Sequence, residues 1–491
     1  MNVHYSLLIA SSLVLAGCQP AQQKAPSPLP QHNAAMTDYF ADNALGTPLA
    51  IVQHPAGVHY QGVTYVSYQG PLEDPYIAAY NHNTQQWTGP VKAGISDMGK
   101  DLNRRKKIDN HGKPSMIIDD LGYIHIFFGG HGGTDKHGEN RLGNKHYGTN
   151  KHVVSTQPGD ISHWQQLDNI TPFGTYNQVV KMDNGDIYLF YRHGAHRSDW
   201  VFQKSTDHGR TFSDPISFLK HKRRTDLKAV DSWYAWVGRG HGDDIIVSYD
   251  YHLCWDGGAG VNARGHTGER HDVYYMAFNT KTGQWRNVKG EALKIPVTRE
   301  LADEKTLVAR TGGVDYWTFN GSTKLDEQGN PHIGISIGKD DGTYAGGMKQ
   351  TAYYRYDGQT WVGGTLVYPQ ARIDNTEAYG DFTVTAPTDV TFTFGYKDQT
   401  DGVIAYFNTR NGGASFTKTQ ELLRLRNKSW AMTSLITHAH PDAKVIAAAR
   451  TPGSSWSELY LLGDNGAIAR PQSQTALLTP QDKTQLARFN K

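Results

Sequence analysis

Residues 176–194 read YNQVVKMDNGDIYLFYRHG and consist of two runs of strand-forming residues on either side of a turn. Asn184 and Gly185 can take the positive φ angles of a tight hairpin turn, and the flanking runs are rich in Val, Ile, Tyr and Phe. The stretch therefore predicts a β-hairpin. Because residues that are symmetric about Asn184 face each other, Tyr176 and Arg192 are expected side by side at its open end.

The same pattern, a turn followed by an alternating strand, recurs along the chain. Each copy is preceded by another strand-like run and followed by a second turn, which predicts four strands per unit. A composition with 52 Gly and 27 Tyr residues, and without long helical periodicity, is typical of such short strands. We therefore predict an all-β fold, a single-domain seven-bladed β-propeller with four antiparallel strands per blade. The seven copies cover residues 62–69, 122–128, 185–192, 243–251, 329–337, 389–396 and 443–450.

Two of the second turns share a motif. Residues 205–212 read STDHGRTF and residues 409–416 read TRNGGASF. Both resemble the Asp box, S/T-x-D/N-x-G-x-S/T-F/W, a turn between the third and fourth strands of sialidase-like propeller blades. Asp207 and Asn411 would cap their own turns, so these residues are expected to be structural. The hairpin before each box is then the inner pair of a blade, and its open end lies at the central channel.

Four polar side chains are expected together at this channel. His111 and His131 are symmetric about Leu121, which lies in the turn of the preceding hairpin, so the two histidines should face each other. Tyr176 and Arg192 of the next hairpin open on the same face. The sequence therefore predicts a cluster of two His, one Tyr and one Arg residue.

This cluster lacks the pair of carboxylates that glycoside hydrolases normally use, but it suits β-elimination on a uronic acid. That reaction needs a group to neutralise the sugar carboxylate, a base and an acid. Arg192 can bind a carboxylate with two hydrogen bonds. His111 can act as a base near its ordinary pKa of about 6.5, and Tyr176 can be the acid, or the base if Arg192 lowers its pKa. His131 could share the carboxylate or orient the base.

A second set of residues has the chemistry of metal ligands. His252 and Cys254 lie on one side of a predicted strand end, and His266 follows a Gly-rich loop. These donors predict a structural, tetrahedral zinc ion with a fourth ligand still to be identified. The alternative is a buried free thiol with unrelated histidines. A calcium ion at the carboxylates of residues 339–342 is left open.

The N-terminus has the pattern of an export signal. Residues 1–18 read MNVHYSLLIASSLVLAGC, and residues 15–18 match the lipobox of bacterial lipoproteins, in which Cys18 is lipidated. Gln19 resembles the pattern for sorting to the outer membrane, and plain secretion is the alternative. We expect a signal peptide over residues 1–17, a flexible tether over 18–43, the catalytic propeller over 44–475 and a tail over 476–491.

The formal net charge is only +2, but basic residues gather at residues 104–107 and 220–224. Such runs are either solvated loops or landing sites for a polyanion. Arg104 and Arg105 lie shortly before His111, so they are candidates for binding a polyanion. We expect no nucleic acid partner and a monomeric protein.

The order and spacing of these residues resemble the ulvan lyases of polysaccharide lyase family 25, secreted seven-bladed propellers of marine bacteria. The resemblance covers essentially the whole mature chain. It rests on His111, the FFGGHGG run through His131, Tyr176, the YRHG run with Arg192, and the set His252, Cys254 and His266.

The resemblance implies cleavage of ulvan between 3-sulfated rhamnose and glucuronic or iduronic acid, which leaves unsaturated uronyl ends. It implies that His111 and Tyr176 are base and acid, and which is the base depends on the uronic epimer. It also implies that Arg192 and His131 bind the carboxylate and that His252, Cys254 and His266 hold a structural zinc ion. Further substrate contacts are expected at His193, Trp233 and Tyr234.

Two other functions remain open from the sequence. The Asp boxes are compatible with a sialidase-like glycoside hydrolase, although no arginine triad or Tyr/Glu nucleophile pair can be placed at the rim. A non-catalytic glycan-binding propeller anchored to the outer membrane is the second alternative.

Overall fold

The computed structural model of the chain describes residues 35–100, 108–109, 111–260, 269–311, 316–341, 347–369 and 380–474, with residues 1, 263, 265 and 480. Almost all regular structure in these ranges is antiparallel β-sheet, and the predicted all-β class is confirmed. The helices described are α1 (Arg299–Lys305) and the short 3-10 turns η1 (Pro71–Glu73), η2 (Asp135–His137) and η5 (Gln472–Gln474). None of the helices in these ranges has the length and apolar character needed to cross a membrane.

Four sheets each consist of four strands in chain order, as the repeat pattern predicts. The first two are β7 (Ser115–Ile118), β8 (Ile124–His131), β9 (Tyr147–Ser155) and β10 (Trp164–Leu167), and β11 (Thr175–Lys181), β12 (Ile187–Arg192), β13 (Trp200–Ser205) and β14 (Ile216–Leu219). The other two are β22 (Tyr316–Leu325), β23 (Pro331–Lys339), β24 (Gln350–Tyr356) and β25 (Trp361–Leu366), and β26 (Gly380–Ala386), β27 (Asp389–Asp398), β28 (Asp401–Thr409) and β29 (Thr417–Leu425).

A fifth sheet has seven strands. Its inner run of four antiparallel strands, β16 to β19, repeats the order of the smaller sheets, and shorter strands extend it on both sides. The strands are β15 (Lys222–Arg223), β16 (Ala229–Arg239), β17 (Asp244–Trp255), β18 (Glu269–Asn279), β19 (Gln284–Arg286), β20 (Ala292–Leu293) and, paired with β18, β21 (Leu307–Ala309).

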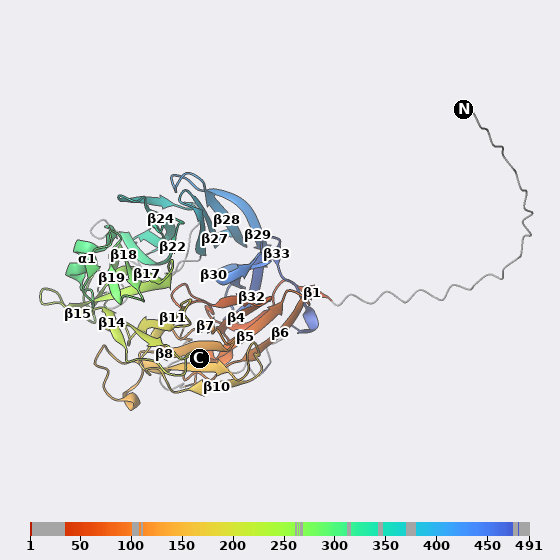
Figure 1. Cartoon of the computed structure of the whole chain (residues 1–491), viewed down its shortest axis with the longest axis horizontal. Coiled ribbons are helices and arrows are strands. Elements are labelled where there is room, and N and C mark those ends of the chain that lie inside the picture. The colour runs from red at the N-terminus through yellow and green to blue at the C-terminus, as the bar shows by residue number, and fades with distance from the viewer. Residues whose placement is uncertain are drawn as a thin grey trace, which may run out of the picture.

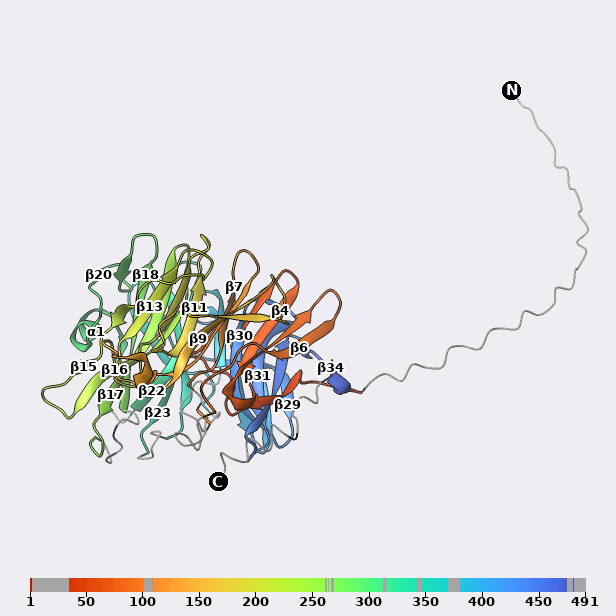
Figure 2. The same ribbon diagram turned by 90° about the horizontal axis from the view of Figure 1, so that it is seen from below.

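A sixth sheet has nine strands and joins the beginning of the described chain to its end. A single parallel pairing, Val58 with Thr437, connects β3 to β30, and β2 pairs with β32. Figures 1 and 2 both show strands of the first and last units side by side. The strands are β2 (Ala41–Leu45), β3 (Gly57–Tyr60), β4 (Val63–Gln69), β5 (Pro75–Asn81), β6 (Gln86–Lys92), β30 (Ser429–His440), β31 (Ala443–Arg450), β32 (Trp456–Gly463) and β33 (Gly466–Ala467).

The predicted repeat is present strand by strand. Each of the seven predicted strands is found as the second strand of an antiparallel hairpin, in β4, β8, β12, β17, β23, β27 and β31. The sheets of the described residues, however, number four of four strands, two larger ones and one of two strands.

The ordered fold begins earlier than the predicted boundary at residue 44. The strand β1 (Met36–Thr37) pairs with β34 (Arg470–Pro471), and β2 begins at Ala41. The signal peptide from residue 2 onward, the tether up to residue 34 and most of the tail lie outside the described residues.

Both Asp boxes form the predicted turns. In the first, Asp207 accepts hydrogen bonds from the backbone N–H and the hydroxyl of Thr211, at 2.9 and 2.6 Å. In the second, Asn411 accepts one from the N–H of Ser415 at 3.1 Å. Both turns connect the third and fourth strands of their sheets, β13 to β14 and β28 to β29. The ring of Phe212 packs edge-on against Phe127 of the neighbouring sheet, so the core lies between adjacent sheets.

Candidate active site

The open end of the β11–β12 hairpin contains a bulge. Between Gln178 and Lys181 the pairing is centred on Asn184 as predicted, but Arg192 pairs with Thr175 and not with Tyr176. Tyr176 has a φ of 65°. A non-glycine residue in this left-handed region costs of the order of 1–3 kcal/mol, which is typical of functional sites. The predicted pairing is wrong by one residue, whereas the predicted proximity is confirmed: the guanidinium carbon of Arg192 lies 4.9 Å from the Tyr176 ring centre.

Arg192 is a buried cation without a carboxylate partner among the described residues. Its side chain is 0% exposed, and its Nε donates a long hydrogen bond of 3.4 Å to the carbonyl of Gly194. Neither Nη atom has a hydrogen-bond acceptor in the part of the chain that the structure describes. Burying an unpaired charge is costly, so the two Nη groups are suited to an anionic ligand.

Trp233 and Tyr234 are neighbours on β16 and face opposite ways. The Tyr234 ring lies 5.6 Å from Tyr176 and 5.3 Å from the Arg192 guanidinium. Burial raises the pKa of the Tyr234 phenol, but the charges of Arg270 and Arg192 outweigh it and the net pKa is lowered. The prediction for Trp233 is wrong: it is 0% exposed and its Nε1 donates to the carbonyl of Lys220 at 2.8 Å, so it is a core residue.

His111 and His131 face each other as predicted. Their rings stack with centres 3.6 Å apart, and the strands between them pair symmetrically about Leu121. The carboxylate of Asp109 accepts a hydrogen bond from each ring, 2.5 Å to Nδ1 of His111 and 2.9 Å to Nδ1 of His131. Because an ionised carboxylate can only accept, Asp109 fixes the proton of both rings on Nδ1. The His111 ring centre is 5.4 Å from that of Tyr176, so the four predicted residues form one cluster.

His193 does not join this cluster. Its ring nitrogens bond to Oδ1 of Asn140 at 2.9 Å and Oγ1 of Thr171 at 3.3 Å. Burial lowers its pKa to about 4. The His193 ring therefore lies apart from the four predicted residues, and its role as a substrate contact stays a prediction.

Known proteins match this chain over most of its length. The family model of BNR repeat-containing family members matches residues 63–367. A protein named ulvan lyase PL25 from Pseudoalteromonas sp. (strain PLSV) is 57% identical over 480 residues, which is 97% of this chain and 96% of that protein. An ulvan lyase of Alteromonas sp. (strain LOR) is 55% identical over 96% of both chains. The chain belongs to the ulvan lyases of polysaccharide lyase family 25. The protein is therefore an enzyme, a polysaccharide lyase.

A solved structure supports the same assignment. The family 25 ulvan lyase bound to -[GlcA(1-4)Rha3S]- is 58% identical and has a TM-score of 0.85. The match covers 92% of this chain and 99% of that one. The family resemblance that the sequence indicates is thus confirmed.

The enzyme also brings together metal-ligating side chains next to the cluster. Ligand atoms of His196, His252 and Cys254 all lie within 4.8 Å of one another. The predicted pair of His252 and Cys254 is therefore joined by His196, which the sequence analysis missed. His196 lies in the turn between β12 and β13, four residues after Arg192. Ring nitrogens of His196, His111 and His131 also lie within 4.8 Å of one another. Burial raises the pKa of the Cys254 thiol.

Several predicted residues of the enzyme are not described. Arg104, Arg105 and His266 lie outside the described residues, as does residue 342 of the acidic run proposed for calcium.

The basic run at residues 220–224 of the enzyme has carboxylate partners. Lys220 is paired with Asp199 at 3.1 Å, and Lys222 with Glu300 at 2.6 Å. Arg223 and Arg224 are likewise paired, with Asp256 and Asp226, each at 2.5 Å. This run therefore fits a solvated, ion-paired loop better than a landing site for a polyanion.

Proposed function

We propose that the enzyme cleaves ulvan by β-elimination between 3-sulfated rhamnose and glucuronic or iduronic acid, and leaves an unsaturated uronyl end. The observation that carries this proposal is the buried guanidinium of Arg192, without a described carboxylate partner and in contact with Tyr176. Relatives named ulvan lyase at 55–57% identity, and a solved relative bound to a glucuronate–rhamnose sulfate unit, support the choice of polymer.

Arg192 is proposed to bind the carboxylate of the uronic acid. The proton on the carbon next to that carboxylate is only weakly acidic, and removing it places negative charge on the carboxylate. A guanidinium that is already buried and in place stabilises this charge without reorganisation. His131 lies beside His111 and shares its Asp109 partner, so it is proposed to bind the other side of the same carboxylate.

His111 and Tyr176 are proposed to transfer the protons. Asp109 holds the Nδ1 proton of His111, which directs the basic Nε2 away from Asp109, and the His111 side chain is 28% exposed. The base takes the proton from C5, the C4–O bond breaks, a C4–C5 double bond forms, and the acid protonates the released rhamnose oxygen. The C5 protons of the two epimers lie on opposite faces of the ring. His111 and Tyr176 would therefore exchange roles between glucuronic and iduronic acid.

We also propose a structural zinc ion on His196, His252 and Cys254. Two imidazole nitrogens and one sulfur are a donor set that zinc prefers, and their mutual separation of at most 4.8 Å fits one ion. His266 stays a predicted fourth ligand. When bound, zinc would supply no step of the reaction. It would tie the turn after β12 to the end of β17 and so hold His196 beside the catalytic histidines.

The seven-bladed count is part of the same proposal. The nine-stranded sheet can be divided at the single Val58–Thr437 pairing into β3 to β6 and a unit of β30 to β32 completed by β2. The seven-stranded sheet contains one further unit, β16 to β19. Together with the four separate sheets this gives seven blades, with the N-terminal strand closing the ring.

The proposed setting is extracellular. The lipobox at residues 15–18 supports export and a lipid anchor at Cys18 in the outer membrane. In this proposal a tether after Cys18 leads to a single catalytic propeller domain. We propose a monomeric enzyme.

The decisive test is incubation of the purified protein with ulvan while the ultraviolet absorbance of the unsaturated uronyl product is followed. A rise in absorbance together with new chain ends is expected. New reducing ends without absorbance would show hydrolysis, and binding without new ends would show a glycan-binding propeller.

A further inference from the structure

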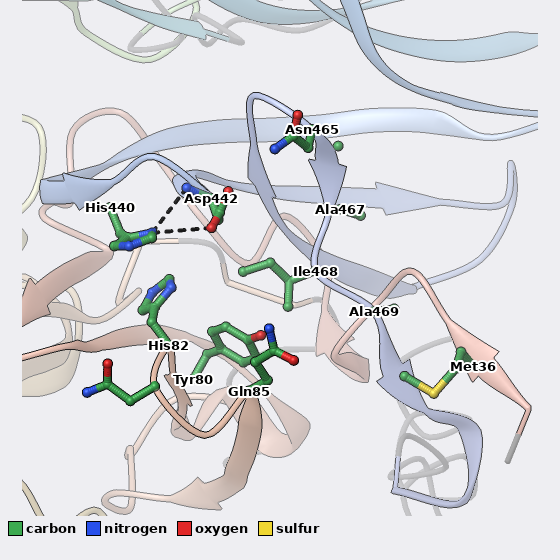
Figure 3. Close-up of a pocket in the computed structure, with 12 residues that line it drawn as sticks. Met36, Tyr80, His82, Gln85, His440, Asp442, Asn465, Ala467, Ile468 and Ala469 are labelled. Carbon is green, nitrogen blue, oxygen red and sulfur yellow. Dashed lines mark hydrogen bonds and ion pairs between the residues drawn. The ribbon is translucent and has the colours of Figure 1, made fainter. Parts of the chain in front are cut away.

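A second histidine cluster lies at the junction of the first and last units. His82 directly follows β5, His440 ends β30, and Asp442 lies in the turn that leads to β31. They line a pocket with Tyr80 and Ile468, and Figure 3 shows the two imidazoles facing each other at its edge with Asp442 beside His440. The pocket of about 480 Å³ leaves room for water molecules to complete the coordination of an ion.

The donor atoms in this pocket are spaced for one metal ion. Ligand atoms of His82, His440 and Asp442 lie within 4.8 Å of one another. The ring centres of His82 and His440 are 3.9 Å apart, and Nδ1 of His440 is 3.7 Å from Oδ2 of Asp442. Ligands at ~2.1 Å from a tetrahedral ion are separated by roughly 3.4 Å, so small side-chain movements would close the site.

Thr64 orients the His82 ring. The buried Thr64 hydroxyl lies 2.8 Å from Nε2 of His82 and 3.0 Å from Nδ1 of His59. One hydroxyl can donate only once, so it accepts from one ring and donates to the other. With Nε2–H of His82 donating to Thr64, the lone pair of Nδ1 is left for a metal. Such a hydrogen bond from the second ring nitrogen is the usual support of a metal-binding histidine.

The surroundings of the pocket favour a cation. The lining residues include no Lys or Arg. The nearby Lys444 is paired with the carboxylate of Asp464 at 2.6 Å. Asp442 is thus the one charged side chain among the residues that line the pocket.

We propose that His82, His440 and Asp442 form a binding site for a divalent transition-metal ion of the zinc class. The site is separate from the zinc ligands around Cys254 and from the catalytic cluster, and it does not depend on the proposed function. A bound ion would link the turn after β5 to the turn between β30 and β31. It would therefore join the first unit of the fold to the last one.

The test uses the whole protein with the metal that it retains on purification. Zinc is added, and uptake is measured by isothermal titration calorimetry and elemental analysis after dialysis. One further equivalent is expected for the wild type and for the control His163→Ala, which removes a histidine with a 78% exposed side chain elsewhere on the surface. The additional equivalent should be lost in His440→Asn and in His82→Gln, while lyase activity is unchanged.

Asp442→Asn gives a second measurement that does not endanger the fold, because the Asp442 side chain is 55% exposed. Its dissociation constant for the additional ion should rise at least about tenfold. Zinc should also raise the melting temperature of the wild type more than that of this variant. Absence of the further equivalent in the wild type, or an unchanged dissociation constant in Asp442→Asn, would overturn the proposal.

Discussion

Two pairs of neighbouring histidines in this fold differ in the group that holds them. At the candidate active site, His111 and His131 share the buried carboxylate of Asp109. At the junction of the first and last units, His82 is held by the neutral hydroxyl of Thr64. A carboxylate partner stabilises an imidazolium and suits a base that must accept a proton, whereas a neutral partner leaves an uncharged ring. A pair of imidazole rings can thus suit proton transfer or metal binding, depending on the group that holds it.

Removal of the proton-transfer groups themselves should have the largest effect on the catalytic pair. Tyr176→Phe and His111→Ala should each lower kcat by about 10²- to 10⁴-fold, since each removes a general acid or base. Initial rates on ulvan check this, with melting temperatures near wild type as the control. Near-normal turnover in either variant would remove that residue from the mechanism.

The Arg192 carboxylate site should be nearly as sensitive. Arg192→Lys keeps the charge but loses the two-pronged geometry, so kcat/KM should fall about 10²- to 10³-fold. Arg141→Lys, at a position where the side chain is 85% exposed, is the matched control and should keep full activity. Arg192→Met should also be inactive but no less stable, because it removes a buried charge without a described partner. A clear fall in its melting temperature would show that Arg192 has a structural role.

Asp109→Asn tests the carboxylate that His111 and His131 share. An amide cannot accept Nδ1–H bonds from two rings as a charged carboxylate does, so the basic tautomer of His111 is no longer enforced. We expect a loss of about 10²-fold in kcat and a shift of the pH–rate profile. Thr64→Val, the corresponding change at the other pair, should leave both unchanged. A loss of rate without any shift of the profile would indicate a packing defect.

Two other histidines, which hydrogen-bond to neutral side chains, should make the fold less stable at low pH. Burial lowers the pKa of His152 to about 3 and of His54 to about 4, and their partners are the amides of Asn169 and Gln178. In the unfolded chain both titrate near 6.5, so the unfolded state binds more protons below that pH. The free energy of unfolding should therefore fall as the pH drops from about 6.5 towards 4. Chemical denaturation across this range measures the fall, and His152→Gln should make it shallower if the variant folds.

Much of this site was predictable because hairpins obey a simple symmetry. The turn around Leu121 placed His111 opposite His131, and the turn around Asn184 placed Tyr176 near Arg192. The bulge was not predictable, because a tyrosine at positive φ has no signal comparable to that of glycine or asparagine.

Contacts between units were also harder to predict than contacts within a hairpin. Asp109 and His196 reach the site from connecting segments, whose course depends on packing between sheets and not on strand pairing. The opposite orientations of Trp233 and Tyr234 follow from strand alternation, but which of them faces the site is decided by the neighbouring blade.

The pairing of β2 with β32 has a consequence for when the chain can complete its fold. β2 is synthesised early, but its partner β32 follows more than 400 residues later. β2 can pair only when the last unit is available, and contacts of such long sequence separation form slowly. A chain of this design would therefore complete its fold only after its last strands have been synthesised.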